Sequence, residues 1–183
     1  DGALWIHKSA GYRADQIDRV ECFVDSASAR LDRCQLPSGP EEAKFSTAYC
    51  VALGLLYGTV GVEHFLCDSS IDPEARELAG RIQVTESLDF PEHSSFPNRL
   101  RVYFRNGCCQ EYLGEYGKGD PRAALTKEER KDKFNDCLAR ICGGADTGDI
   151  FQRLNQIEAY ADVCQLTEWI RTRLAVQKGD DRI

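Results

Sequence analysis

The sequence predicts an α+β fold: a small domain of helices with an antiparallel, hairpin-containing sheet, followed by a C-terminal all-helical segment. Apolar and polar residues alternate in three short stretches of the first two-thirds, which is the period of half-buried strands. Beyond residue 122 only helical spacing of apolar residues remains. We therefore expect an α+β domain at residues 1–122 and C-terminal helices at residues 123–183.

The first elements are a helix, a strand and a long helix. Residues 2–10 have a helical pattern, and residues 19–25 alternate as a half-buried strand. A loop rich in proline and glycine follows. Apolar residues then recur at helical spacing over residues 41–57, and Gly58 is a natural stop for one continuous helix.

A short helix and a second strand come next. Asp72 is a candidate N-cap, and Pro73 suits the first helical position. This helix should end at Gly80, and residues 81–86 then alternate as a strand.

A β-hairpin is expected between residues 100 and 113. Apolar residues alternate over 100–104, and Asn106-Gly107 is the pair favoured in two-residue turns. A returning strand should therefore occupy residues 109–113.

The last third reads as three helices. Thr126 and Glu129 have the spacing of a capping box, which opens a helix that Gly143 and Gly144 should end. Two more helical stretches are expected near residues 147–160 and 163–175.

Composition excludes several classes of protein. The chain has 183 residues, 42% of them hydrophobic and 29% charged, so disorder is not expected. A net charge of −7 argues against nucleic-acid binding. The longest apolar stretch, residues 49–62, is shorter than the roughly 20 residues that cross a bilayer, so no membrane partner is expected. The chain has no methionine, and we expect it to be the back part of a longer protein.

Cysteine and histidine patterns predict neither a metal site nor a cofactor. The nine cysteines form no C-x-x-C pair, so we expect reduced thiols in the cytoplasm, or in the mitochondrial matrix of a eukaryote. Cys22, Cys50 and Cys137 occupy apolar positions of predicted elements. The three histidines have no metal-ligand spacing and are expected at the surface or in caps.

Five residues near the long helix are candidates for binding an anion. Arg30, Arg33 and Lys44 flank the loop, and Ser46 and Tyr49 lie one turn either way along the helix. Fixed cations beside hydroxyl groups suit a polycarboxylate or an enolate-like intermediate. The alternative is a solvated start of a helix, with Tyr49 in the core. No residue of this set is a convincing general base.

The stretch EEAKFSTAYCVALGLLYGTVGVEHF, residues 41–65, resembles a segment typical of the MmgE/PrpD family. That family includes 2-methylcitrate dehydratase, cis-aconitate decarboxylase and iminodisuccinate epimerase. The shared positions are residues 42–46, 49–52, 58 and 60–65. The resemblance continues over residues 2–24, 101–107, 117–134 and 157–170, and so covers nearly the whole chain.

The resemblance implies that this chain is the C-terminal part of the family's architecture. Members have a large N-terminal helical domain, and the active site lies between the two domains. The acid and base residues are therefore expected outside this chain, and residues 123–183 should pack on that helical domain. The family's chemistry needs no metal or cofactor, and a homo-oligomer is expected.

Three functions remain open. The first is one wall of a hydro-lyase that dehydrates a citrate-like or alkylcitrate-like polycarboxylate, acting with an N-terminal helical chain or domain. The second is an epimerase or isomerase of a dicarboxylate. The third is a non-catalytic binding or oligomerisation module. Decarboxylase members carry a tyrosine where this chain has Arg30 and Leu31, which argues against decarboxylation.

Overall fold

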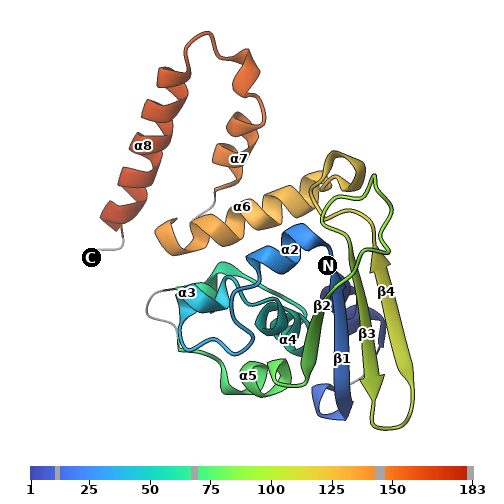
Figure 1. The fold of residues 1–183 in the computed structure, drawn as a ribbon. Coiled ribbons are helices and arrows are strands. Elements are labelled where there is room, and N and C mark those ends of the chain that lie inside the picture. Colours follow the sequence, from blue (N-terminus) through green and yellow to red (C-terminus); the bar gives the residue numbers. More distant parts are fainter. Residues whose placement is uncertain (11–12, 67–69, 143–146, 181–183) are drawn as a thin grey trace. The chain divides into compact units, whose positions relative to one another are not determined.

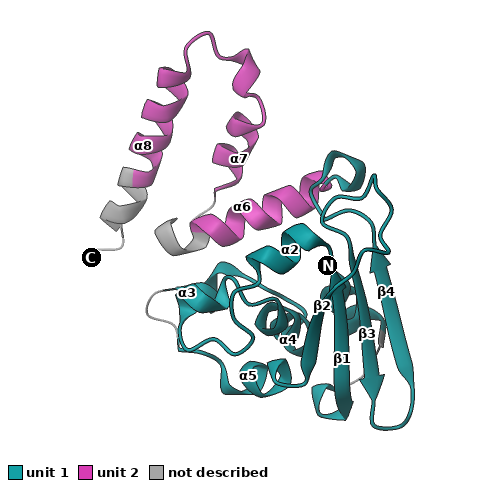
Figure 2. Cartoon of the chain, viewed as in Figure 1, with its two compact units in different colours: residues 1–124 teal, residues 125–183 magenta. Residues whose placement is uncertain are grey.

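The computed structural model describes residues 1–10, 13–66, 70–142 and 147–180. The chain divides into two compact units, Asp1–Ala124 and Leu125–Ile183 (Figures 1 and 2). Among the described residues, no helix combines the length and the apolar character needed to cross a membrane.

A four-stranded sheet forms one layer of the first unit. The strand order is β2-β1-β3-β4. β1 runs parallel to β2 and antiparallel to β3, and β3 and β4 form the predicted hairpin. The fold class is thus confirmed, with one parallel pair inside the sheet. The strands are β1 (Ile17–Val24), β2 (Ile82–Glu86), β3 (Asn98–Phe104) and β4 (Cys109–Gly114).

Alternation along the strands separates a buried face from an outer face. Val20, Cys22 and Val24 of β1 are buried, and so are Leu100 and Val102 of β3. Helices α1 (Gly2–Ala10), α4 (Thr47–Tyr57) and α5 (Pro73–Ala79) complete the core on that side, and α1 and α4 contact the strands (Figure 1). Burying this face is the main stabilising contribution to the unit.

Five α-helices lie among the described residues of the first unit, and one expectation about them is wrong. The predicted single helix over residues 41–57 is two helices, because Ser46 leaves the helical conformation and its hydroxyl caps the second one. Gly58, with φ of 66°, ends that helix as predicted. The helices are α1 (Gly2–Ala10), α2 (Ser26–Leu31), α3 (Pro40–Ala43), α4 (Thr47–Tyr57) and α5 (Pro73–Ala79).

The turn of the hairpin differs from the predicted two-residue turn. The N–H of Gly107 donates to the carbonyl oxygen of Phe104, 2.9 Å away, so Arg105 and Asn106 occupy the centre of the turn. Gly107 follows with φ of 86°. This is the three-residue loop in which a turn is followed by a left-handed residue, normally glycine.

Backbone hydrogen bonds join the loop between β2 and β3 to the segment that follows β4. The N–H of Ser95 donates to the carbonyl oxygen of Glu115, and the N–H of Gly117 donates to that of Ser95, both at 3.0 Å. Phe96 follows Ser95 directly and precedes Pro97, which is buried. The backbone of Phe96 has a φ of 50°. Among the described residues other than glycine, it alone has a positive φ.

The second unit contains α6 (Lys127–Cys142), α7 (Gly148–Leu154) and α8 (Val163–Asp180). The predicted capping box is present: the hydroxyl of Thr126 accepts from the N–H of Glu129, whose carboxylate accepts from the N–H of Thr126. The predicted stop at residues 143–144 lies outside the described residues. The rings of Phe134 and Phe151 are 5.4 Å apart and join α6 to α7.

Candidate functional site

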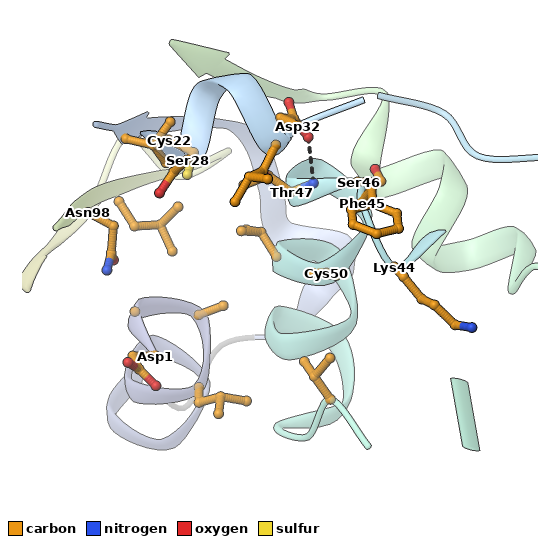
Figure 3. Close-up of a pocket in the computed structure, with 18 residues that line it drawn as sticks. Asp1, Cys22, Ser28, Asp32, Lys44, Phe45, Ser46, Thr47, Cys50 and Asn98 are labelled. Carbon is orange, nitrogen blue, oxygen red and sulfur yellow. Dashed lines mark hydrogen bonds between the residues drawn. The ribbon is translucent and has the colours of Figure 1, made fainter. Parts of the chain in front are cut away.

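A cavity of about 620 Å³ opens in the first unit (Figure 3). Its lining comes from the start of α1, the buried faces of β1 and β3, α2 and the start of α4. Apolar side chains make up most of the lining, among them Leu4, Val24, Leu31, Phe45, Val51 and Leu100. This size and character are those of a small-molecule site, for which volumes of about 300–1,000 Å³ are usual.

Local sequence signals place the walls of this cavity. Asp25 directly follows β1, and its carboxylate accepts from the N–H of Ser28, 2.9 Å away, which starts α2 beside the sheet. The break before α4 brings Lys44 and Phe45 to the opposite wall. α2 itself was expected to be part of a loop, although an aspartate N-cap is a recognisable start signal.

Asp32 links the two walls. Its Oδ1 accepts a hydrogen bond from the N–H of Thr47, 2.8 Å away, at the start of α4 (Figure 3). The N–H of neighbouring Arg33 donates to the carbonyl oxygen of Phe45 at 2.8 Å. A carboxylate at this position also interacts favourably with the dipole of the 11-residue helix.

The hydroxyl of Ser46 is committed to holding the backbone. Ser46 is 1% exposed. Its Oγ accepts from the N–H of Tyr49 at 3.1 Å and donates to the carbonyl oxygen of Gln35 at 3.2 Å. Ser46 therefore fixes the shape of the cavity wall, because its hydroxyl both accepts and donates a hydrogen bond to the backbone.

Two thiols line the cavity in their neutral form. Burial and, secondarily, the Asp32 carboxylate raise the pKa of Cys22 to about 12 and that of Cys50 to about 11. The Cys50 thiol donates to the carbonyl oxygen of Ala43, 3.6 Å away. Since the thiolate is the nucleophile, neither group is activated at neutral pH. Cys137, expected at an apolar position, is exposed instead, because it lies on the solvent side of α6.

The structure brings only part of the predicted anion-binding set together. Lys44 and Ser46 line the cavity, whereas Arg30 and Arg33 are exposed and are not among its lining residues. The Lys44 ammonium pairs with Glu41 at 2.7 Å and points away from the cavity interior (Figure 3). Tyr49 is 1% exposed and belongs to the core.

The histidines occupy surface and capping positions, as expected. His7 is exposed, and its Nδ1 donates to the carbonyl oxygen of Leu55, 2.8 Å away. His64 Nδ1 lies 3.2 Å from the backbone of Gly61, and His93 is exposed. Within the described ranges no group of three or more potential metal ligands is found.

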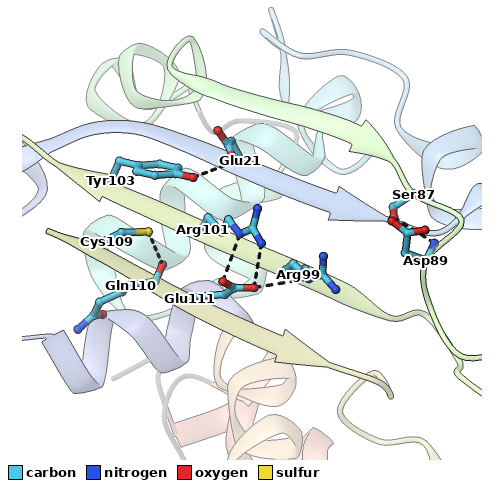
Figure 4. A network of polar contacts seen from close by, with 9 residues as sticks. All are labelled: Glu21, Ser87, Asp89, Arg99, Arg101, Tyr103, Cys109, Gln110 and Glu111. Atoms are coloured by element: carbon cyan, nitrogen blue, oxygen red, sulfur yellow. Dashed lines mark hydrogen bonds and ion pairs between the residues drawn. The ribbon is translucent and has the colours of Figure 1, made fainter. Parts of the chain in front are cut away.

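The outer face of the sheet carries a polar network (Figure 4). Glu111 pairs with Arg101 at 3.2 Å and with Arg99 at 3.5 Å, and the Tyr103 hydroxyl donates to Glu21 at 3.1 Å. Since these charges largely compensate one another, we place the candidate site in the cavity.

Sequence reasoning missed Ser28, Asp32 and Asn98 as lining residues. The first two follow an N-cap signal that the sequence contains, whereas no local pattern marks Asn98 at the start of β3. Only the pairing of β3 with β1 brings that residue to the cavity.

A family model, the MmgE/PrpD C-terminal domain, matches residues 1–156. The search of curated proteins found no match. The matched range includes the cavity and the whole sheet, and it confirms the resemblance seen in residues 41–65. The chain therefore belongs to the MmgE/PrpD family, of which it carries the C-terminal domain.

Proposed function

We propose that this chain forms one wall of the active site of a metal-independent hydro-lyase that dehydrates a citrate-like or alkylcitrate-like polycarboxylate. The family match supports this, because members of the family include dehydratases. The observation that carries the proposal is the cavity, since it lies within the matched region and has Lys44 in its lining.

The reaction begins with removal of a proton from the carbon next to a carboxylate. The electrons of that C–H bond form a carbon–carbon double bond as the bond to the β-hydroxyl group breaks. A general acid protonates the leaving hydroxyl, which departs as water. Fixed positive charge stabilises the enediolate that develops on the carboxylate.

This chain contributes binding and orientation to that reaction. The Lys44 ammonium can exchange its exposed partner Glu41 for a substrate carboxylate, because a surface ion pair contributes little stability. Ser46 and Asp32 hold the wall behind Lys44 through their bonds to the start of α4. The general acid and base come from an N-terminal helical domain or chain, on which residues 123–183 pack.

The enzyme acts as a homo-oligomer in the cytoplasm, or in the mitochondrial matrix of a eukaryote. Native and denaturing mass spectrometry of the protein purified from its source tests its composition. Either a longer polypeptide or a second chain of different mass should contain the helical domain. A short chain that travels alone and is inactive would contradict the proposal and favour a binding module.

A dehydration assay tests the reaction. With citrate or 2-methylcitrate, the conjugated double bond of the product should appear in the ultraviolet spectrum. The same incubation in deuterated water distinguishes an epimerase from a dehydratase. Deuterium incorporation at a carbon next to a carboxylate without loss of water would show an epimerase and overturn the dehydratase assignment.

A further inference from the structure

We propose that the cavity binds an unbranched alkyl chain of several carbons, carried by the polycarboxylate that the site takes. This inference rests on the proposed function and specifies the substrate class. The carboxylates lie at the mouth of the cavity, near Lys44, and the neutral chain enters it.

The volume of the cavity exceeds what a small substituent fills. At about 30 Å³ per water molecule, 620 Å³ corresponds to about 20 waters. A methyl group replaces about one of them, so most of the apolar lining would stay hydrated around a methyl-substituted acid. A longer chain removes that lining from water and gains affinity with each methylene.

The carboxylate of Asp32 disfavours entry of a charged end of the ligand. Asp32 lines the interior, and its negative charge acts on the thiols of both Cys22 and Cys50, which belong to different walls. A second carboxylate beside Asp32 would be repelled and would lose its hydration. An uncharged chain meets neither cost.

Ser28 and Asn98 add a hydroxyl and an amide to the lining, whereas two other polar groups are already engaged. The Ser46 hydroxyl is occupied by Tyr49 and Gln35, and one oxygen of Asp32 is occupied by Thr47. The two thiols are small and polarisable and behave as hydrophobic groups. Because most of the lining is apolar, the interior selects mainly by shape and apolar area, whereas the mouth selects by charge.

Calorimetric titration of the 183-residue chain with 2-alkylsuccinates, from methyl to octyl, tests this inference. It measures binding alone and does not require catalysis. The affinity should rise about fourfold per added methylene until the cavity is full. Cys50→Leu and Ser28→Leu narrow the cavity from opposite walls. Each substitution should lower the affinity for octylsuccinate about fifteenfold, as expected if two methylenes no longer fit, and leave the affinity for methylsuccinate unchanged.

Cys137→Leu is the matched control, because Cys137 is exposed on α6 and the substitution should change no affinity. Thermal unfolding of each variant verifies that it folds, and two variants on separate walls keep the test decisive if one fails to fold. An affinity that does not depend on chain length would overturn the inference, since protein or water would then fill the cavity.

The titration tests the alkyl site and the dehydration assay tests the proposed function, so either one can fail without the other. A rising series with no dehydration in any assembly would retain the alkyl site and reject the lyase. Dehydration of citrate together with a flat series would retain the lyase and reject the alkyl site.

Discussion

The phenolic oxygen of Tyr49 accepts a hydrogen bond from the backbone N–H of Asp72, 3.0 Å away. Asp72 in turn caps α5, because its Oδ1 accepts from the N–H of Ala75 at 2.8 Å. Its Oδ2 accepts from the hydroxyl of Tyr57, also at 2.8 Å. Two tyrosines of α4 thus hold the residue that starts α5.

Removal of the Tyr49 hydroxyl should destabilise the first unit. Tyr49→Phe leaves the N–H of Asp72 unpaired, and the free energy of unfolding should fall by about 1–3 kcal/mol in urea denaturation. Tyr57→Phe is the control, because Tyr57 is 42% exposed and water can replace its contact. Equal losses in both variants would contradict a structural role specific to Tyr49.

Phe96 should be strained in the folded protein. A left-handed conformation costs a residue with a Cβ about 1–2 kcal/mol, and glycine avoids that cost. Phe96→Gly and Phe45→Gly remove similarly exposed rings, 57% and 51%, but only Phe96 has a positive φ. Phe96→Gly should therefore be the more stable variant by about 1–2 kcal/mol in chemical denaturation. The reverse order would show that the ring of Phe96 contributes more than the strain costs.

The stability of the first unit should fall at alkaline pH because of the buried thiol of Cys22. Burial raises the pKa of Cys22 from 9.0 to about 12, so the folded state keeps a proton that the unfolded state loses. The contribution of Cys22 is complete below pH 9 and is lost as the pH rises towards 12. Urea unfolding of the wild type and of Cys22→Val across this range should show a steeper decline for the wild type. Parallel curves would exclude the Cys22 thiol as the cause.

The cations near the loop should differ in their effect on the proposed reaction. Lys44→Gln should raise KM for the polycarboxylate about tenfold or more, the usual effect of losing a hydrogen bond to a charged group. Arg30→Gln should leave KM unchanged, because Arg30 lies outside the lining of the cavity. Steady-state kinetics on the complete enzyme provides the comparison, and a larger effect of Arg30→Gln would move the anion site to α2.

Elements that depend on local signals were predictable from the sequence. The hairpin, the capping box at Thr126 and the stop at Gly58 each follow from residues within a few positions of one another. The break at Ser46 was missed because the apolar period continues through it, although serine is a favoured N-cap. The turn at Gly107 was assigned the wrong length, because Asn106-Gly107 also fits a three-residue loop.

The cavity depends on contacts that no local pattern contains. Lys44 and Ser46 were found because they adjoin a predicted helix. Tyr49 was grouped with them by spacing, but its hydroxyl is directed to Asp72, 23 residues further along the chain. Asn98 reaches the cavity only through the pairing of β3 with β1. Periodicity predicts which face of an element is buried, but it does not predict which elements share that face.

The central position of β1 has a consequence for the order of folding. β3 and β4 are joined by a tight turn, and such hairpins form in about 1–10 μs. β1 pairs with β2 and β3, which lie far along the chain, so both pairings carry a larger loop-closure cost. During synthesis β1 leaves the ribosome before either partner, and until they arrive its apolar residues need protection from aggregation. Of these four strands, the one made first is thus the one whose pairings complete the sheet last.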